Sequence, residues 1–200
     1  MLTIALILPG ATDYDAQGRI QGSLNIPMNE EGLEEVRKLA DELRGCPLEV
    51  IYGPADSEPS GETASSLAAA LDVKLKKLDN LQNVNYGLWQ GMLFEEVKHK
   101  QPKVFRQWQE QPECICPPDG ETLAEARERV QAVVGRLLKK HKSGTIGVVV
   151  SEPLATLLRN CLRPGEIGDL ARASTEHGCC EMIEVEPQAG PLVVDRASSS

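Results

Sequence analysis

One stretch near the start of the chain decides the fold: Ile4-Ala5-Leu6-Ile7-Leu8-Pro9-Gly10-Ala11-Thr12-Asp13-Tyr14-Asp15, running on to Gly18-Arg19-Ile20-Gln21-Gly22. Its five consecutive apolar residues, bounded by Pro9-Gly10, predict a short strand that is buried on both faces and ends in a polar loop. In an open α/β sheet, ligands bind outside the carboxyl ends of such strands. The residues from Leu8 onward are therefore expected to border a binding site.

The rest of the chain alternates between short apolar runs and helical patterns. The runs that we interpret as strands are residues 48–52, 73–78, 145–151, 183–186 and 191–194. Apolar residues favour helices in residues 33–43, 65–71, 94–108 and 123–138. Asn29 is placed to cap the first helix and Gly45 to end it. With 200 residues and 41% hydrophobic content, the chain suits one α/β domain with a core of its own.

Four segments carry motifs that occur in a recognisable order. The first contains Gly10, Thr12, Gly18, Arg19, Gln21 and Gly22. The others are Tyr86-Gly87-Leu88-Trp89-Gln90-Gly91, Pro117-Pro118-Asp119-Gly120-Glu121-Thr122 and Val149-Val150-Ser151-Glu152-Pro153. Over roughly residues 3–162 the chain resembles the histidine phosphatase superfamily, the phosphoglycerate-mutase-like phosphatases and mutases. The resemblance implies a three-layer α/β/α sandwich with a mostly parallel central sheet.

The positions that carry chemistry in this family hold other residues in this chain. The family's phosphate-binding Arg and nucleophilic His correspond to Leu8 and Pro9. The proton-donating Glu corresponds to Asn83, and the second His of the phosphate pocket corresponds to Glu152. Residues 55–64, where the family has another phosphate-gripping Arg, contain no Arg or Lys.

These replacements remove what phosphoryl transfer to a histidine requires: an imidazole nucleophile, cations for the phosphate oxygens and an acid for the leaving oxygen. The amide of Asn83 cannot deliver a proton at neutral pH. We therefore expect a catalytically inactive member, or pseudoenzyme, without catalytic residues and with a binding, scaffolding or regulatory role. The lining of the old pocket is expected to include Gly10, Thr12, Asp15, Arg19, Gln21, Asn83 and Glu152.

Two alternatives stay open. A divergent phosphatase would act on phosphate esters by a non-histidine route, in which Asp13, Asp15 and Glu152 converge on Mg²⁺ or another hard cation. The competing interpretation is that Asp13 and Asp15 are turn residues of a loop. A small-molecule binder would instead use the old pocket without turnover. The three histidines are expected at the surface, away from the strand ends: His99, His141 and His177.

The net charge of −9 argues against nucleic acid, anionic membranes or phosphorylated compounds as generally attracted partners. The apolar residues 1–9 lack a cationic leader region and are too short to span a bilayer. We expect a cytoplasmic protein with reduced thiols. Cys114, Cys116, Cys179 and Cys180 would supply four zinc ligands, but neither pair has the usual spacing. No metal and no cofactor is therefore expected.

Glu152 stands between a buried strand and a helix that begins near Pro153, where proline is well tolerated. The free N–H groups and the positive dipole end of a helix favour an anion at this place. We interpret Glu152 as a built-in anion that fills part of the vacated phosphate site. One domain is expected over residues 1–195, followed by a disordered tail at 196–200. The binding partner, a protein or a small molecule, is not identified by these patterns.

Overall fold

A five-stranded sheet forms the centre of the computed structural model, which describes residues 1–163, 165, 167, 170–172 and 174–185. The strands lie in the order β3 (Lys74–Leu78), β2 (Leu48–Pro54), β4 (Gly144–Val149), β1 (Leu2–Ile7) and β5 (Cys180–Val185). All neighbouring pairs are parallel except β1 with β5, which is antiparallel. The mostly parallel sheet expected from the sequence is confirmed.

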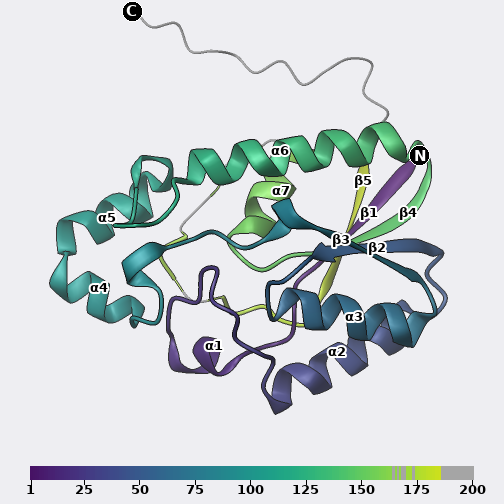
Figure 1. Ribbon diagram of the computed structural model, residues 1–200, viewed down its shortest axis with the longest axis horizontal. Coiled ribbons are helices and arrows are strands. Elements are labelled where there is room, and N and C mark those ends of the chain that lie inside the picture. The colour runs from purple at the N-terminus through teal and green to yellow at the C-terminus, as the bar shows by residue number, and fades with distance from the viewer. Residues whose placement is uncertain (164, 166, 168–169, 173, 186–200) are drawn as a thin grey trace, which may run out of the picture.

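Helices cover both faces of the sheet and make three layers (Figure 1). The helices α2 (Glu30–Leu43) and α3 (Ser60–Leu71) pack on one face, and α6 (Leu123–Lys140) and α7 (Leu154–Leu162) pack on the other. The remaining elements are α1 (Asp13–Gln17), α4 (Phe94–Lys100), α5 (Pro102–Glu110) and three short 3₁₀ turns, η1 (Asp79–Leu81), η2 (Gly87–Trp89) and η3 (Pro112–Cys114).

The side chains of β1 alternate between the two faces of the sheet and pack into the apolar cluster on each face. Leu2, Ile4 and Leu6 belong to the apolar cluster on the α6 side, while Ala5 and Ile7 belong to the cluster on the α2 side. Successive side chains of a strand point to opposite faces, so a continuous apolar run is what a strand covered by helices on both faces requires. The strand predicted to be buried on both faces is therefore confirmed.

Side-chain caps set the starts of the two amphipathic helices. Asn29 Oδ1 accepts a hydrogen bond from the backbone N of Gly32 at 2.9 Å, as expected for α2. Thr122 and Glu125 form a capping box at the start of α6, in which Thr122 N donates to Glu125 Oε2 at 2.8 Å. The pKa of Glu125 is lowered by these bonds from Thr122.

The loop expected after Pro9 contains a helix that the sequence pattern did not indicate. Thr12 N donates to Asp15 Oδ2 at 2.8 Å and Asp15 N donates to Thr12 Oγ1 at 3.3 Å, which is a capping box at the start of α1. Gly18 ends the helix in the left-handed conformation, with φ of 66°. The interpretation of Asp13 and Asp15 as loop residues is therefore wrong. A Thr and an Asp at this spacing are typical of a turn as well as of a helix N-terminus.

Several expectations fall outside the residues that the structure describes. The strand at 191–194, the domain limit at 195 and the tail at 196–200 all lie there. In the described part of the chain, no helix has the length and apolar character needed to cross a bilayer. All six cysteines are unpaired.

The backbone after β1 packs closely against the backbone at the start of α2, at Gly10 and Gly32. A Cβ atom at Gly10 would overlap the carbonyl oxygen of Gly32, whereas one at Gly135 in α6 would meet nothing within 4 Å. Gly10→Ala should therefore lower the free energy of unfolding by about 1–3 kcal/mol. The control Gly135→Ala should leave it unchanged or raise it by up to about 1 kcal/mol. Equal stabilities in chemical denaturation would contradict this packing.

Candidate functional site

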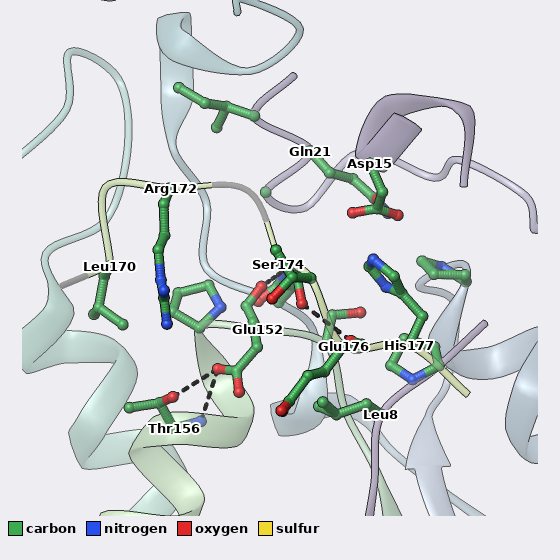
Figure 2. Close-up of a pocket in the computed structure, with 18 of the residues that line it drawn as sticks. Leu8, Asp15, Gln21, Glu152, Thr156, Leu170, Arg172, Ser174, Glu176 and His177 are labelled. Atoms are coloured by element: carbon green, nitrogen blue, oxygen red, sulfur yellow. Dashed lines mark hydrogen bonds between the residues drawn. The ribbon is translucent and has the colours of Figure 1, made fainter. Parts of the chain in front are cut away.

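A cavity of about 270 Å³ lies at the carboxyl ends of the parallel strands. Residues 8–10 after β1 and 151–153 after β4 meet there, together with residues 15–22 of the α1 region. Asn83 and Tyr86 reach the cavity from the segment that follows β3, and further lining residues come from the segment before β5 (Figure 2). This is the crevice in which open α/β sheets hold ligands.

The segment before β5 continues the sheet beyond the end of β1. The backbone N of Leu8 donates to the carbonyl oxygen of Cys179 at 2.9 Å, and the N of Gly178 donates to the oxygen of Pro9 at 2.8 Å. This pairing brings His177 into the lining of the cavity (Figure 2). The expectation that His177 lies away from the strand ends is therefore wrong, because no sequence pattern indicated that this segment folds against Pro9.

The α1 region supplies Asp15 and Gln21 to the cavity. Thr12 is fully buried, and its hydroxyl donates to Asp15 Oδ2 at 2.7 Å. Gln21 Nε2 donates to the carbonyl oxygen of Glu58 at 3.0 Å. The carboxylate of Asp15 is thus held by its capping bonds, and Figure 2 shows it facing the imidazole of His177.

A second loop holds the α1 region in place. Gln90 Oε1 accepts hydrogen bonds from the backbone N of Ser23 at 2.7 Å and of Tyr86 at 3.3 Å. The guanidinium of Arg19 donates to the carbonyl oxygen of Gly91 at 2.6 Å. Arg19 lines the cavity while one of its nitrogens is used for this support.

Asn83 is buried, and both ends of its amide are engaged. Its Nδ2 donates to the carbonyl oxygen of Glu152 at 2.9 Å, and its Oδ1 accepts from the backbone N of Val84 at 2.9 Å. The side chain therefore joins the loop after β3 to the loop after β4. In this arrangement Asn83 supports the wall of the cavity.

The carboxylate of Glu152 lies at the N-terminus of α7. Its Oε2 accepts from the backbone N of Thr156 at 3.0 Å and from the Thr156 hydroxyl at 2.7 Å (Figure 2). Its Oε1 lies 3.6 Å from Arg159, whose Nε donates to Glu181 Oε2 at 2.7 Å. Because the first N–H groups of a helix have no partner within it, this carboxylate satisfies a donor and meets the positive end of the helix dipole.

The titration behaviour of nearby groups follows from this arrangement. Burial alone would lower the pKa of Arg159, but hydrogen bonding to Glu181 and the charge of Glu152 outweigh burial and raise it. Burial, followed by the charge of Glu152, raises the pKa of Tyr86, so its phenol stays protonated. Burial also raises the pKa of Cys179, which opposes formation of a thiolate nucleophile beside the cavity.

The lining carries charges of both signs. Carboxylates come from Asp15, Glu152 and Glu176, and guanidinium groups come from Arg19 and Arg172. Arg172 is exposed, and its side chain extends into the cavity opposite Glu152 (Figure 2). The cavity is therefore polar and mixed in charge rather than cationic.

The residues proposed for a hard cation do not meet. Asp13 is exposed on α1 and is not part of the lining, to which Asp15 and Glu152 both belong. Within the described part of the chain, no group of three or more His, Cys, Asp or Glu side chains is placed to hold a metal ion. Cys114 and Cys116 are exposed, whereas Cys179 and Cys180 are partly buried.

The structure brings six of the seven expected pocket residues to the cavity: Gly10, Asp15, Arg19, Gln21, Asn83 and Glu152. The seventh, Thr12, is buried behind Asp15. Sequence reasoning missed the contribution of Thr156 and of the segment before β5, namely Arg172, Ser174, Glu176 and His177. The helical spacing of Thr156 from Glu152 was a usable signal for the first, whereas the irregular segment offered none.

A family model described as histidine phosphatase superfamily (branch 1) matches residues 4–196. The chain belongs to the histidine phosphatase superfamily. A relative within it, phosphoserine phosphatase 1 of Hydrogenobacter thermophilus, is 33% identical over 149 residues, which are 74% of this chain and 70% of that protein. The metal-independent phosphoserine phosphatase of Arabidopsis thaliana is 26% identical over 148 residues, 73% of this chain and 62% of that protein. Longer mycobacterial relatives, 31% identical, are spanned by the chain over only 44% of their length.

Solved structures of low sequence identity share the fold. The YhfR protein of Bacillus stearothermophilus superposes with a TM-score of 0.82 at 21% identity and covers 100% of this chain and 98% of its own. A phosphoglycerate mutase from Bacillus anthracis gives a TM-score of 0.75 at 19% identity, covering 90% of this chain and 86% of its own. The phosphoglycerate-mutase-like architecture implied by the sequence motifs is confirmed.

The bonds at the start of α7 predict a stability effect. Glu152→Gln removes the charge from the N-terminus of α7 and one of the two carboxylate partners of Arg159, so it should lower the free energy of unfolding at neutral pH by about 1–2 kcal/mol. Glu181→Gln is the control, because it breaks more exposed pairs with Arg159 and Arg163 but leaves the N-terminus of α7 untouched. A loss in Glu152→Gln no larger than in the control, measured by urea denaturation, would show that Glu152 does not stabilise α7.

Proposed function

We propose that this protein is a catalytically inactive member of the histidine phosphatase superfamily whose cleft binds a small polar molecule or a protein segment without turning it over. The observation that carries the proposal is the position of Glu152. Its carboxylate takes the Thr156 donors at the N-terminus of α7, which would otherwise be open to a bound anion. A fixed negative charge inside the cleft opposes the entry of a phosphate dianion.

The missing nucleophile and acid support the same conclusion. Position 9 is proline, whose nitrogen is part of a peptide bond and cannot attack phosphorus. Asn83 has no acidic proton, and both ends of its amide are already bonded within the protein. Removing single members of a catalytic set commonly reduces rates by about 10⁴–10⁶-fold. Replacement of the whole set leaves no route by the chemistry that the motif serves.

The retained cavity supports a binding role. Gly10, Arg19, Gln21 and Gly22 of the first motif and Tyr86 of the second line the cavity, so these wall residues match the superfamily motifs while the reactive groups differ. Three carboxylates and two guanidinium groups suit a ligand that carries both positive and negative charge, such as a zwitterion. The relatives named phosphoserine phosphatase act, by their names, on a compound with an amino acid part. A free amino acid is therefore a reasonable first ligand to test.

A second candidate function follows from His177. This imidazole lines the cavity beside Pro9 and faces Asp15 (Figure 2), so it offers a nucleophile from the neighbouring strand segment. In this candidate, a His177 nitrogen would attack the phosphorus, the ester oxygen would leave and take a proton from water, and water would then release phosphate. Two relatives that are named phosphoserine phosphatases support this candidate, because it is a phosphatase reaction.

The two candidates predict opposite results in one assay. The purified protein should not release phosphate from phosphoserine or p-nitrophenyl phosphate above a protein-free blank, with or without Mg²⁺. Pro9→His alone should not restore turnover. Leu8 supplies no positive charge for the phosphate oxygens, and the carboxylate of Glu152 repels them. Turnover that survives repurification and disappears in His177→Gln would refute inactivity and establish the second candidate. His99→Gln on α4 is the matched control for a histidine substitution.

A further inference from the structure

A cluster of basic side chains lies apart from the cleft, and none of its members lines the cavity. Six of the 21 lysine and arginine residues fall in two four-residue segments: Lys74-Leu75-Lys76-Lys77 in β3, and Lys139-Lys140-His141-Lys142 at the end of α6. In a chain with a net charge of −9, this concentration of positive charge is a local reversal of sign. An inference from this basic cluster does not depend on the proposed function of the cleft.

Packing brings the two segments together over Tyr52 of β2. The sheet register places Lys76 directly beside Tyr52, and α6 crosses the same face of the sheet (Figure 1). Lys76 Nζ lies 6.0 Å from the centroid of the Tyr52 ring, and Lys140 Nζ lies 5.5 Å from it. The Tyr52 hydroxyl and His141 Nε2 are 2.9 Å apart. The two ammonium groups are therefore held over one aromatic ring that is itself fixed by a hydrogen bond.

The lysines of this cluster form no close ion pairs among the described residues, since none of the six has one within 4 Å there. The side-chain contact with Lys140 is the main cause of a lowered pKa at Lys76, although Tyr52 opposes it. Burial lowers the pKa of His141, with a further contribution from Lys140, while Glu49 acts in the opposite direction. Like charges are thus close together here, and none of the six lysines has an ion-pair partner among the described residues.

We propose that Lys76 and Lys140 form a binding site for a compact polyphosphate anion, seated above Tyr52 and His141. Lysine is a common ligand of phosphate, and two adjacent ammonium groups gain most from an anion that carries several charges in a small volume. Tyr52 is only 2% exposed, so the site offers no aromatic face on which a base could stack. The overall negative charge also repels a long polyanion more than a short one. These features favour a small polyphosphate over nucleic acid.

Lysines on an edge strand also have a simpler explanation, since they discourage pairing of the open edge with another chain. That explanation accounts for Lys74, Lys76 and Lys77 on β3. It does not account for Lys140, which comes from α6, or for the convergence of Lys76 and Lys140 over Tyr52. The two explanations differ in whether an anion binds.

Titration with inorganic tripolyphosphate at low salt tests the proposal. Calorimetry should show saturable binding that weakens as salt is added. The double variant Lys76→Gln/Lys140→Gln should bind at least about tenfold more weakly. The control Lys38→Gln/Lys103→Gln makes the same change in net charge on exposed faces of α2 and α5, and it should shift the affinity by less than about twofold.

The three histidines report where the anion binds. In proton NMR, the ring resonances of His141 should move during the titration, while those of His99 on α4 and His177 in the cleft stay in place. Absence of saturable binding, or equal losses in the two double variants, would overturn the proposal. Movement of His177 alone would overturn it as well and would locate the anion in the cleft, which would contradict the proposed function separately. Binding of a single-stranded oligonucleotide in preference to tripolyphosphate would assign the cluster to nucleic acid instead.

Discussion

The pairing of β1 on both of its edges is the constraint on which the rest of the structure depends. β1 is parallel to β4 on one side and antiparallel to β5 on the other, and its side chains enter both apolar clusters. The parallel pairing places the ends of β1 and β4 at the same edge of the sheet, so Pro9 and Glu152 border one cavity. Because β5 is antiparallel to β1, it begins at that same edge, so the segment before β5, which includes His177, borders the cavity. Both sides of the cleft thus depend on the pairing of one strand.

Two polar side chains of the cleft, Glu152 and Asn83, are bonded to other groups of the protein. The carboxylate of Glu152 accepts a hydrogen bond at the N-terminus of α7 and pairs with Arg159. The side-chain amide of Asn83 hydrogen-bonds two backbone groups. A reactive site needs donors and cations aimed at the charge that develops on the substrate. Glu152 and Asn83 are instead directed at groups of the protein, which is consistent with the proposed binding role.

Most of the fold was predictable because its determinants are local. The apolar run at 4–8, the cap at Asn29 and the helical stripe of α6 each act within a few residues, and each appears in the structure as expected. The helix α1 was missed since the capping box of Thr12 and Asp15 spans only one turn and is also typical of a loop. The cleft was predictable only in part. Motif residues that follow strands were found, but Arg172, Glu176 and His177 lie in an irregular segment whose position depends on long-range pairing with Leu8 and Pro9.

The central claim is that the cleft holds no group that accepts a phosphoryl group. Intact-protein mass spectrometry, performed without acid after incubation with phosphoserine and with acetyl phosphate, measures this directly. The account predicts an unchanged mass in the wild type and in His177→Gln. A gain of one phosphoryl group in the wild type, located on His177 and absent from His177→Gln, would contradict it.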